Sequence, residues 1–309
     1  MPNPHQSAQR KSRGLRDDVA VELSIVSIVS LGFRSDKSTH FLMISRKEVS
    51  LRLSNTNFMV REETVFGPIR SRRLGNSLGI NLLPVNGKIC TFDCIYCECG
   101  WNKDGRDDTR LPHAAEVREA LETKLKQLVK DGTPVDSITF SGDGESTINP
   151  DFPQIIDDTL ALRDQYYPFA KVSVLSNATQ VHRPEIFAAL RKVDNPIMKI
   201  DAPTNELVQK INIPAPGYDV NRVVEALKQF NGDFVLQTMF LKSKDFDSSS
   251  TEVLEDWMDI VRLLKPREIM AYTIDRPTPE EGLQKFTVEE MKNFLNPLIE
   301  EGFNVQIKG

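Results

Sequence analysis

Cysteine is scarce in this sequence of 309 residues: there are four, at Cys90, Cys94, Cys97 and Cys99, and none elsewhere. A disulfide framework would distribute its cysteines so that they join distant parts of the chain, and this sequence excludes such a framework. Four thiols within ten residues indicate a metal site instead.

Long apolar runs and an excess of positive charge are also absent. A membrane-spanning helix needs about 20 apolar residues, but the longest candidate, residues 19–33, is interrupted by Glu22 and three serines. Residues 10–31 loosely mimic a secretory signal, with Asp17 and Asp18 at its junction, so we expect a cytoplasmic protein without membrane association. The net charge of −5 argues against a general affinity for nucleic acid.

Residues 1–58 differ from the remainder of the chain. They hold nine lysines and arginines against five acidic residues, together with ten serines, and no amphipathic period lasts more than two turns. Such a segment is poorly suited to forming a core. We therefore predict a flexible or mis-started extension at 1–58 and one folded domain at 59–309, with a basic regulatory or targeting arm as the alternative for the extension.

From residue 60 onward, strand-like and helix-like patterns alternate. This alternation predicts an α/β fold with a parallel sheet, whose chemistry gathers at the carboxyl ends of the strands. The expected strands are 78–84, 136–141, 172–176, 196–201, 234–240 and 268–274, with a seventh at 303–308. The expected helices are 114–130, 151–165, 183–192, 219–230, 251–264 and 287–300.

The loop after the first expected strand carries the spacing C-x-x-x-C-x-x-C at Cys90, Cys94 and Cys97. Three thiolates can bind three irons of a [4Fe–4S] cluster, and because full protein ligation takes four cysteines, one iron keeps an open position. Zinc is the alternative, but zinc sites usually pair separated cysteine knuckles or add histidines, and His113 stands alone. Cys99 lies too close to Cys97 to reach the fourth iron, so we do not expect it to be a ligand.

With this spacing the chain resembles the radical S-adenosylmethionine (radical SAM) superfamily. The resemblance implies a partial (β/α)6 barrel with its helices outside, which binds a [4Fe–4S] cluster and S-adenosyl-L-methionine. Tyr96 matches the family's aromatic position near the adenine. Gly142, Asp143, Gly144 and Glu145 match a Gly-Gly-Glu-type turn that meets the cofactor's amino group, with Asp143 in place of the usual glycine.

Polar residues after the next two strands extend this expected cofactor site. Ser176 and Asn177 follow the third strand, where family members contact the cofactor's carboxylate or ribose; a helix cap or turn would explain the same residues. Lys199 and Asp201 alternate at the fourth strand and suggest a polar cavity. We expect Lys199 to bind a carboxylate and Asp201 the ribose or amino group. Arg276 could bind an anionic substrate or form a surface salt bridge.

Residues 67–79, which lead into the first strand, resemble the subgroup related to wyosine-forming tRNA enzymes. Three arginines in this segment, Arg70, Arg72 and Arg73, could serve RNA or be solvated charges on a loop. The archaeal wyosine enzymes carry further cysteines for a second cluster. This chain has none outside the loop, which puts that reaction in doubt.

The resemblance implies an enzyme whose cluster cleaves S-adenosylmethionine to a 5′-deoxyadenosyl radical, which then abstracts hydrogen from a substrate. An electron donor such as flavodoxin or ferredoxin would be its partner, and the substrate would be tRNA or a metabolite. One alternative is an activase that makes a glycyl radical on a partner protein. Another is a non-catalytic iron–sulfur or zinc protein.

Overall fold

The computed structural model describes residues 63–71, 73–85, 87–104 and 109–309, all of which belong to the unit Arg52–Gly309. The predicted extension at 1–58 lies outside the described residues. In the described part of the chain, no helix is long and apolar enough to cross a membrane.

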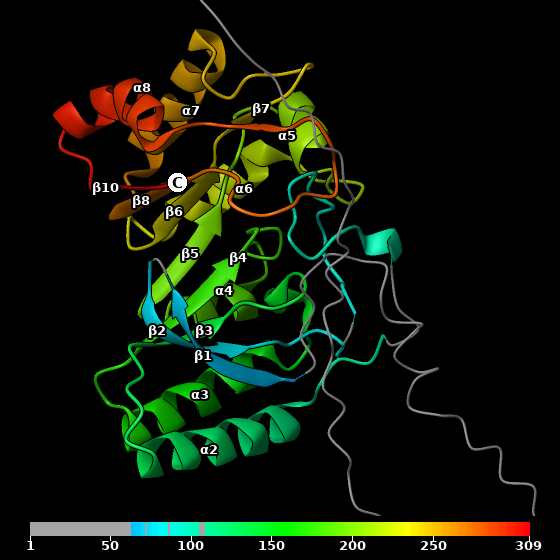
Figure 1. The fold of residues 1–309 in the computed structure, drawn as a ribbon, viewed down its shortest axis with the longest axis vertical. Helices are drawn as coiled ribbons and strands as arrows, with labels where there is room; N and C mark the ends of the chain where they lie inside the picture. Colours follow the sequence, from blue (N-terminus) through cyan, green and yellow to red (C-terminus); the bar gives the residue numbers. More distant parts are fainter. Residues whose placement is uncertain (1–62, 72, 86, 105–108) are drawn as a thin grey trace, which may run out of the picture. The chain divides into compact units, whose positions relative to one another are not determined.

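One eight-stranded sheet, in the order β1-β2-β3-β4-β5-β6-β8-β10, organises the described residues (Figure 1). From β2 to β10 all neighbours pair in parallel, while β1 pairs antiparallel with β2. The sheet curls into a half-barrel, which confirms the predicted α/β partial barrel. The strands are β1 (Val65–Ser71), β2 (Gly75–Ile80), β3 (Ser137–Phe140), β4 (Lys171–Ser176), β5 (Asn195–Lys199), β6 (Val235–Met239), β8 (Glu268–Tyr272) and β10 (Val305–Lys308).

Helices connect the successive parallel strands, with α2 and α3 flanking the first half of the sheet and α7 and α8 the last strands (Figure 1). In α2, the buried residues recur every three or four positions and form one apolar stripe. All six predicted helices are present, with ends within two residues of those expected. The helices are α2 (Ala114–Lys130), α3 (Phe152–Tyr166), α4 (Pro184–Leu190), α5 (Asn205–Ile211), α6 (Val220–Lys228), α7 (Thr251–Leu264) and α8 (Val288–Glu300), with 3-10 turns η1 (Asn102–Asp104) and η2 (Ser146–Ile148).

The structure corrects the prediction at the first strand. The segment 67–79, expected as a lead-in loop, forms most of the antiparallel hairpin β1–β2. Strand β2 ends at Ile80 and not at residue 84, because the Asn81 side chain accepts the Leu83 N–H at 3.1 Å and turns the chain. Helix α5 and the small antiparallel pair β7 (Leu241–Lys242) and β9 (Gln284–Lys285) were also not predicted.

The turn of this hairpin packs onto other strands of the barrel. Leu74 packs against a buried cluster formed by Ile197 of β5, Val235 of β6 and Met270 of β8. The neighbouring Arg73 places its guanidinium 5.0 Å from the centre of the Tyr272 ring. The hairpin therefore joins the first strands of the sheet to its later strands.

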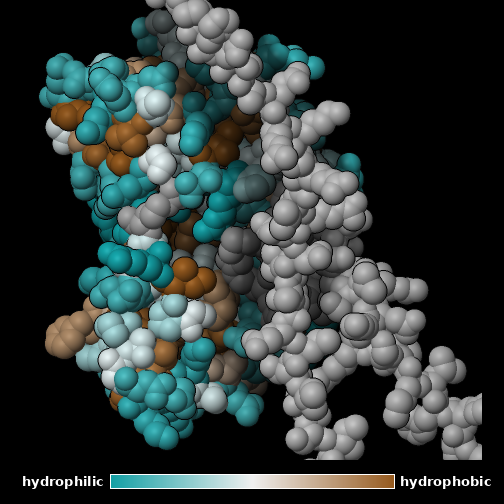
Figure 2. Space-filling model, in the orientation of Figure 1, coloured by the Kyte–Doolittle hydropathy of each residue, from teal (hydrophilic) through white to brown (hydrophobic). Residues whose placement is uncertain are grey.

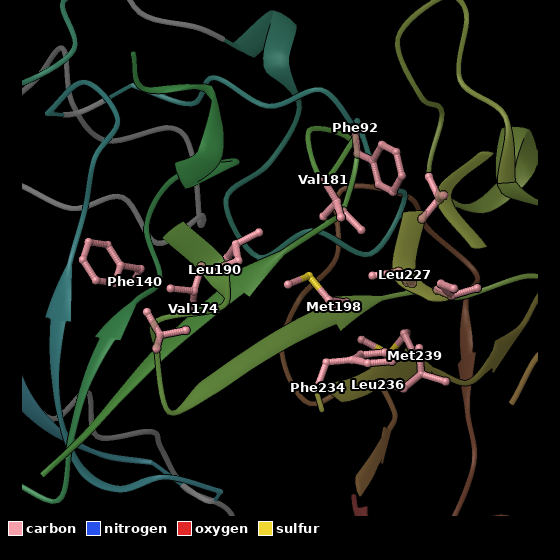
Figure 3. Packing of buried hydrophobic residues seen from close by; sticks show 14 of the residues in the cluster. Phe92, Phe140, Val174, Val181, Leu190, Met198, Leu227, Phe234, Leu236 and Met239 are labelled. Carbon is pink, nitrogen blue, oxygen red and sulfur yellow. The ribbon is translucent and has the colours of Figure 1, made fainter. Parts of the chain in front are cut away.

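The main core also anchors the loop that carries the cysteines. Figure 3 shows Phe140, Val174 and Met198 from three adjacent strands, together with Phe92 of the cysteine loop. Phe92 is 3% exposed, and its ring lies 5.3 Å from that of Tyr218 in an edge-to-face arrangement. The cysteine loop is therefore a packed part of the fold.

Most of the described surface visible in Figure 2 is hydrophilic, with hydrophobic side chains near α7 and α8. The large apolar residues that are exposed, among them Leu263 on α7 and Ile299 on α8, are spread over several elements. Scattered exposure of this kind is usual for globular proteins. The feature that points to function is instead the cavity at the strand ends.

Candidate active site

A cavity of about 290 Å³ lies between the cysteine loop and the carboxyl ends of the parallel strands. This is the end of a parallel α/β barrel at which chemistry is expected. The cavity brings together most of the residues that the sequence predicted, but Asp143 and Asp201 do not line it. The predicted residues that line it are Cys90, Cys94, Tyr96, Cys97, Gly142, Gly144, Glu145, Ser176, Asn177 and Lys199, and Cys99 lines it as well.

The cysteine loop is held by backbone hydrogen bonds to the last residue of α5 and to the segment that follows it. The N–H of Asp93 donates to the carbonyl of Asn212 at 2.8 Å, and the N–H of Ile95 donates to that of Ile211 at 3.0 Å. The N–H of Ala215 donates to the Thr91 carbonyl at 2.8 Å. The conformation of the cysteine loop is therefore held by a segment more than 100 residues away in the sequence.

A buried lysine braces the same loop from within. Lys88 Nζ donates to the Gly100 carbonyl at 2.5 Å and to Asp93 Oδ1 at 3.1 Å, and its side chain is 1% exposed. Burial alone would lower the pKa of Lys88, but the nearby Cys97 and Asp93 outweigh it and raise that pKa. A fixed positive charge therefore lies among the thiols.

The thiols differ in how readily they ionise. Burial raises the pKa of Cys94 to about 12 and also raises that of Cys90. A hydrogen bond from Cys99, helped by Lys88, outweighs burial and lowers the pKa of Cys97 to about 6. Bound iron would favour the thiolate form of all its ligands.

The donor set fits a [4Fe–4S] cluster. Within the described residues, no three His, Cys, Asp or Glu side chains converge on one ion position. A cluster does not require such convergence, because each thiolate binds a different iron. Cys99 Sγ also lies 3.6 Å from Asp143 Oδ1. Its role as a non-ligand stays a prediction.

The glycines after β3 allow the turn to pack against the cysteine loop. Gly144 has φ 142°, and a Cβ there would lie 1.8 Å from the Ile89 carbonyl oxygen. A Cβ on Gly142 would lie 2.1 Å from Asn81 Oδ1. The Ile89 N–H donates to the Asp143 carbonyl at 3.1 Å. The glycines of the turn expected to meet the cofactor's amino group therefore also allow close approach of the cysteine loop.

Glu145 joins the end of β3 to the end of β4. It is 2% exposed and accepts from Ser176 Oγ at 2.9 Å and from the Asn177 N–H at 2.7 Å. It also accepts from the N–H and the hydroxyl of Thr147, at 3.2 and 2.5 Å. Burial outweighs these four donors and raises the pKa of Glu145. Its carboxylate is therefore a structural brace at the cavity wall.

Two tyrosines surround the lysine at the end of β5. Lys199 Nζ donates to the Tyr272 hydroxyl and lies 4.9 Å from the centre of that ring and 5.3 Å from the centre of the Tyr96 ring. Although burial would lower it, the pKa of Lys199 is raised by Asp201, whose Oδ1 lies 3.7 Å away. Lys199 therefore remains charged at the cavity wall.

Asp201 does not line the cavity and belongs to a buried network. It accepts hydrogen bonds from the Tyr96 hydroxyl, from Asn212 Nδ2 at 2.7 Å and from the Met239 N–H at 2.9 Å. The carboxylate therefore positions Tyr96, whose side chain lines the cavity. The pKa of Tyr96 is raised by burial and by Asp201.

Sequence reasoning missed Lys88, Asn212 and Tyr272. Asn212 offered one signal, since it is a polar residue between Ile211 and Ile213, and it proves to be 1% exposed. Lys88 and Tyr272 carried no signal of their own, because their roles depend on contacts that only the fold makes.

The arginines singled out in the sequence lie in different places where the structure describes them. Arg276 and Glu98 both line the cavity and form a half-exposed salt bridge at 2.5 Å, which is one of the two expected roles of Arg276. Arg70 is exposed on β1, whereas Arg73 lines the cavity, and Arg72 lies outside the described residues.

Comparison with known proteins relates this site to a family. Residues 87–247 match the Radical SAM superfamily. The chain is 30% identical over 252 residues, 80% of its length, to a Brachyspira hyodysenteriae protein named GTPase Obg, and covers 35% of that protein. It is 27% identical over 218 residues, 69% of its length, to a Helicobacter pylori UPF0026 protein, and covers 67% of it.

The fold agrees with a solved structure of the same superfamily. A radical SAM methyltransferase from Sphaerobacter thermophilus superposes with a TM-score of 0.58 at 16% identity, over 75% of this chain and 65% of that one. The resemblance to the wyosine-related subgroup stays a prediction. The family match runs from the cysteine loop to beyond β6 and includes every predicted cofactor residue. By this match and by its half-barrel fold, the chain belongs to the radical SAM superfamily.

Proposed function

We propose that this protein binds a [4Fe–4S] cluster through Cys90, Cys94 and Cys97 and acts as a radical SAM enzyme on a substrate held in the same cavity. When bound, the cluster and S-adenosylmethionine supply a 5′-deoxyadenosyl radical that abstracts hydrogen. The observation that carries the proposal is that the three cysteines, the glycine turn and Lys199 line one cavity at the strand ends.

The residues around the cavity suit the parts of S-adenosylmethionine. The ammonium of Lys199 suits the methionine carboxylate, since a charge-assisted hydrogen bond is stronger than a neutral one. Backbone carbonyls of the turn Gly142–Glu145 suit the amino group, and Ser176 and Asn177 suit the carboxylate or ribose. The ring of Tyr96 suits the adenine, and Asp201 contributes by holding that ring.

The substrate and the electron source belong to the same proposal. We propose a cytoplasmic donor of the flavodoxin or ferredoxin type and a tRNA or small-metabolite substrate. The exposed Arg70 on β1 gives a tRNA phosphate one contact at the surface. If tRNA binds, its affinity should fall steeply with salt, and anaerobic turnover followed by mass spectrometry of the tRNA would reveal its product.

Anaerobic reconstitution tests the proposal. The protein should hold about four irons per chain and release 5′-deoxyadenosine when it is reduced with S-adenosylmethionine present. Replacing Cys90, Cys94 or Cys97 with Ala should abolish both, whereas Cys99→Ala, the matched control, should retain most of the iron. A fully loaded cluster that yields no 5′-deoxyadenosine would favour the non-catalytic iron–sulfur alternative.

A further inference from the structure

Each of the three cluster cysteines has a polar donor beside its sulfur. Asn177, after β4, donates its side-chain amide to Cys90 Sγ at 3.6 Å. Asn212, after α5, donates its side-chain amide to Cys94 Sγ at 3.3 Å. The Cys97 sulfur lies beside the Cys99 thiol and the Lys88 ammonium. Two of these donors are asparagines that reach the cysteine loop from separate parts of the barrel.

The surroundings of Asn212 fix the direction of its amide. It is 1% exposed, and its nitrogen lies 2.7 Å from Asp201 Oδ2 and 3.3 Å from Cys94 Sγ. A carboxylate and a thiolate both accept hydrogen bonds, so the NH₂ group and not the carbonyl oxygen must face them. Asp201 is itself held by the Met239 N–H at 2.9 Å, which keeps the amide in place.

Asn177 is oriented in the same way by other partners. Its side-chain oxygen accepts from the Thr179 N–H at 3.1 Å and from the Thr179 hydroxyl at 2.8 Å. Its nitrogen therefore faces the opposite direction, toward Cys90 Sγ and Thr91 Oγ1, the latter at 2.8 Å. Both asparagines thus present a fixed N–H group to a ligand sulfur.

We propose that Asn177 and Asn212 are positioning residues for the cluster, which hold the sulfurs of Cys90 and Cys94 and raise the reduction potential. The inference rests on the proposed function only in that these cysteines bind a [4Fe–4S] cluster. The reduced cluster carries one more negative charge than the oxidised one, and its ligand sulfurs share that charge. A hydrogen bond to sulfur therefore stabilises the reduced state more strongly.

The midpoint potential of the reconstituted full-length protein, followed by electron paramagnetic resonance without S-adenosylmethionine, tests this inference. Asn212→Leu and Asn177→Leu keep a similar volume but remove the donor. Each should lower the equilibrium constant for reduction about tenfold, which is about 59 mV for a one-electron couple.

Asn149→Leu is the matched control. Asn149 is also 1% exposed, but its amide donates to the carbonyls of Leu82 and Pro112, at 3.2 and 3.0 Å. Its replacement should lower the melting temperature of the apo-protein and leave the potential unchanged. Unchanged potentials in the variants at Asn177 and Asn212, or an equal shift in the control, would overturn the inference.

The iron content of each variant completes the test. The apo-protein melting temperature shows whether an Asn212 or Asn177 variant folds. A folded variant that holds less iron supports the inference if Asn149→Leu binds its full complement of iron. The same result overturns the inference if Asn149→Leu loses as much iron. Failure of the unmodified protein to bind a cluster would refute the proposed function. A loaded wild-type cluster with no shift in the variants would refute only this inference.

Discussion

Individual side chains around the cavity either face it or hold others in place. Lys199 faces it, whereas Asp201 is hydrogen-bonded to Tyr96, Asn212 and the backbone of Met239. The sequence placed Lys199 and Asp201 together because they alternate along one strand end. It could not separate their roles, because the partners of Asp201 come from three other segments.

Glu145 should affect stability as well as the cofactor site. Glu145→Ala would leave the buried donors of Ser176, Asn177 and Thr147 without their acceptor, at a cost of about 2–4 kcal/mol in the free energy of unfolding. Urea unfolding of the apo-protein measures this cost. Asp143 is not a suitable control because it contacts Cys99. Glu185→Ala, on the exposed start of α4, is the control and should change the free energy of unfolding little. Equal stability of both variants would contradict the bracing role.

The pH dependence of stability should include a contribution from Asp194. Although burial opposes it, the Val172 N–H at 2.9 Å and Arg163 at 2.8 Å lower the pKa of Asp194 below its usual 3.8. A lowered pKa in the folded state means that the stabilisation is present above the unfolded-state value and is lost as pH falls through the folded-state value. Asp194→Asn should therefore destabilise the protein at pH 7.

The measurement is the difference in unfolding free energy between the wild type and Asp194→Asn at several pH values. That difference should shrink as the pH falls below 3.8. A difference that stays constant from pH 7 down to pH 3 would show that packing, and not the charge of Asp194, causes the loss.

At the level of elements, the sequence predicted what is local and missed what is not. Helix α2 was predicted with its observed bounds because an apolar stripe runs through its 17 residues. Helix α5 was missed although Thr204 caps it. Its length is not the reason, because α4 has the same seven residues and was predicted. The hairpin β1–β2 was missed because its glycines and arginines do not alternate with apolar residues. The cysteine motif was predicted because its spacing is local.

The glycine turn after β3 should depend on its contact with the cysteine loop. Gly144→Ala would place a methyl group 1.8 Å from the Ile89 carbonyl oxygen. The turn must therefore move away from the loop. Gly132→Ala is the matched control, because its φ is also positive, at 65°, but a Cβ there meets nothing within 4 Å. The control should cost about 1–2 kcal/mol from backbone strain alone.

Iron content and melting temperature of the two glycine variants provide the comparison. Gly144→Ala should lose more stability than Gly132→Ala and should bind less iron, because the loop that holds the cysteines is displaced. If Gly144→Ala loads iron as fully as the control, the packing of the turn against the loop is not needed for the cluster site.

Over the whole molecule, the cysteine loop is held by segments that follow β3, β4 and α5. Ile89 forms a β-bridge with the glycine turn, and Cys90 Sγ accepts a hydrogen bond from the Asn177 side chain. The backbone around Asp93 forms hydrogen bonds with residues 211–215. A motif that is local in sequence is therefore assembled only when the half-barrel has formed. This is why the motif could identify the chemistry but not the residues that position it.

The division of the chain at residue 58 is a prediction at the same scale. Residues 1–58 lack the amphipathic pattern from which a core is built, whereas the strands, the helices and the cavity described above all lie between residues 65 and 309. A chain that starts at Met59 should therefore fold and bind the cluster as well as the full chain does.

Thermal melting of the apo-protein and iron content after reconstitution measure the two properties separately. A melting temperature that falls with unchanged iron content would mean that residues 1–58 pack on the barrel away from the cluster. A loss of iron at unchanged melting temperature would mean that they cover the cavity, and either result would contradict the predicted independence of the domain at 59–309.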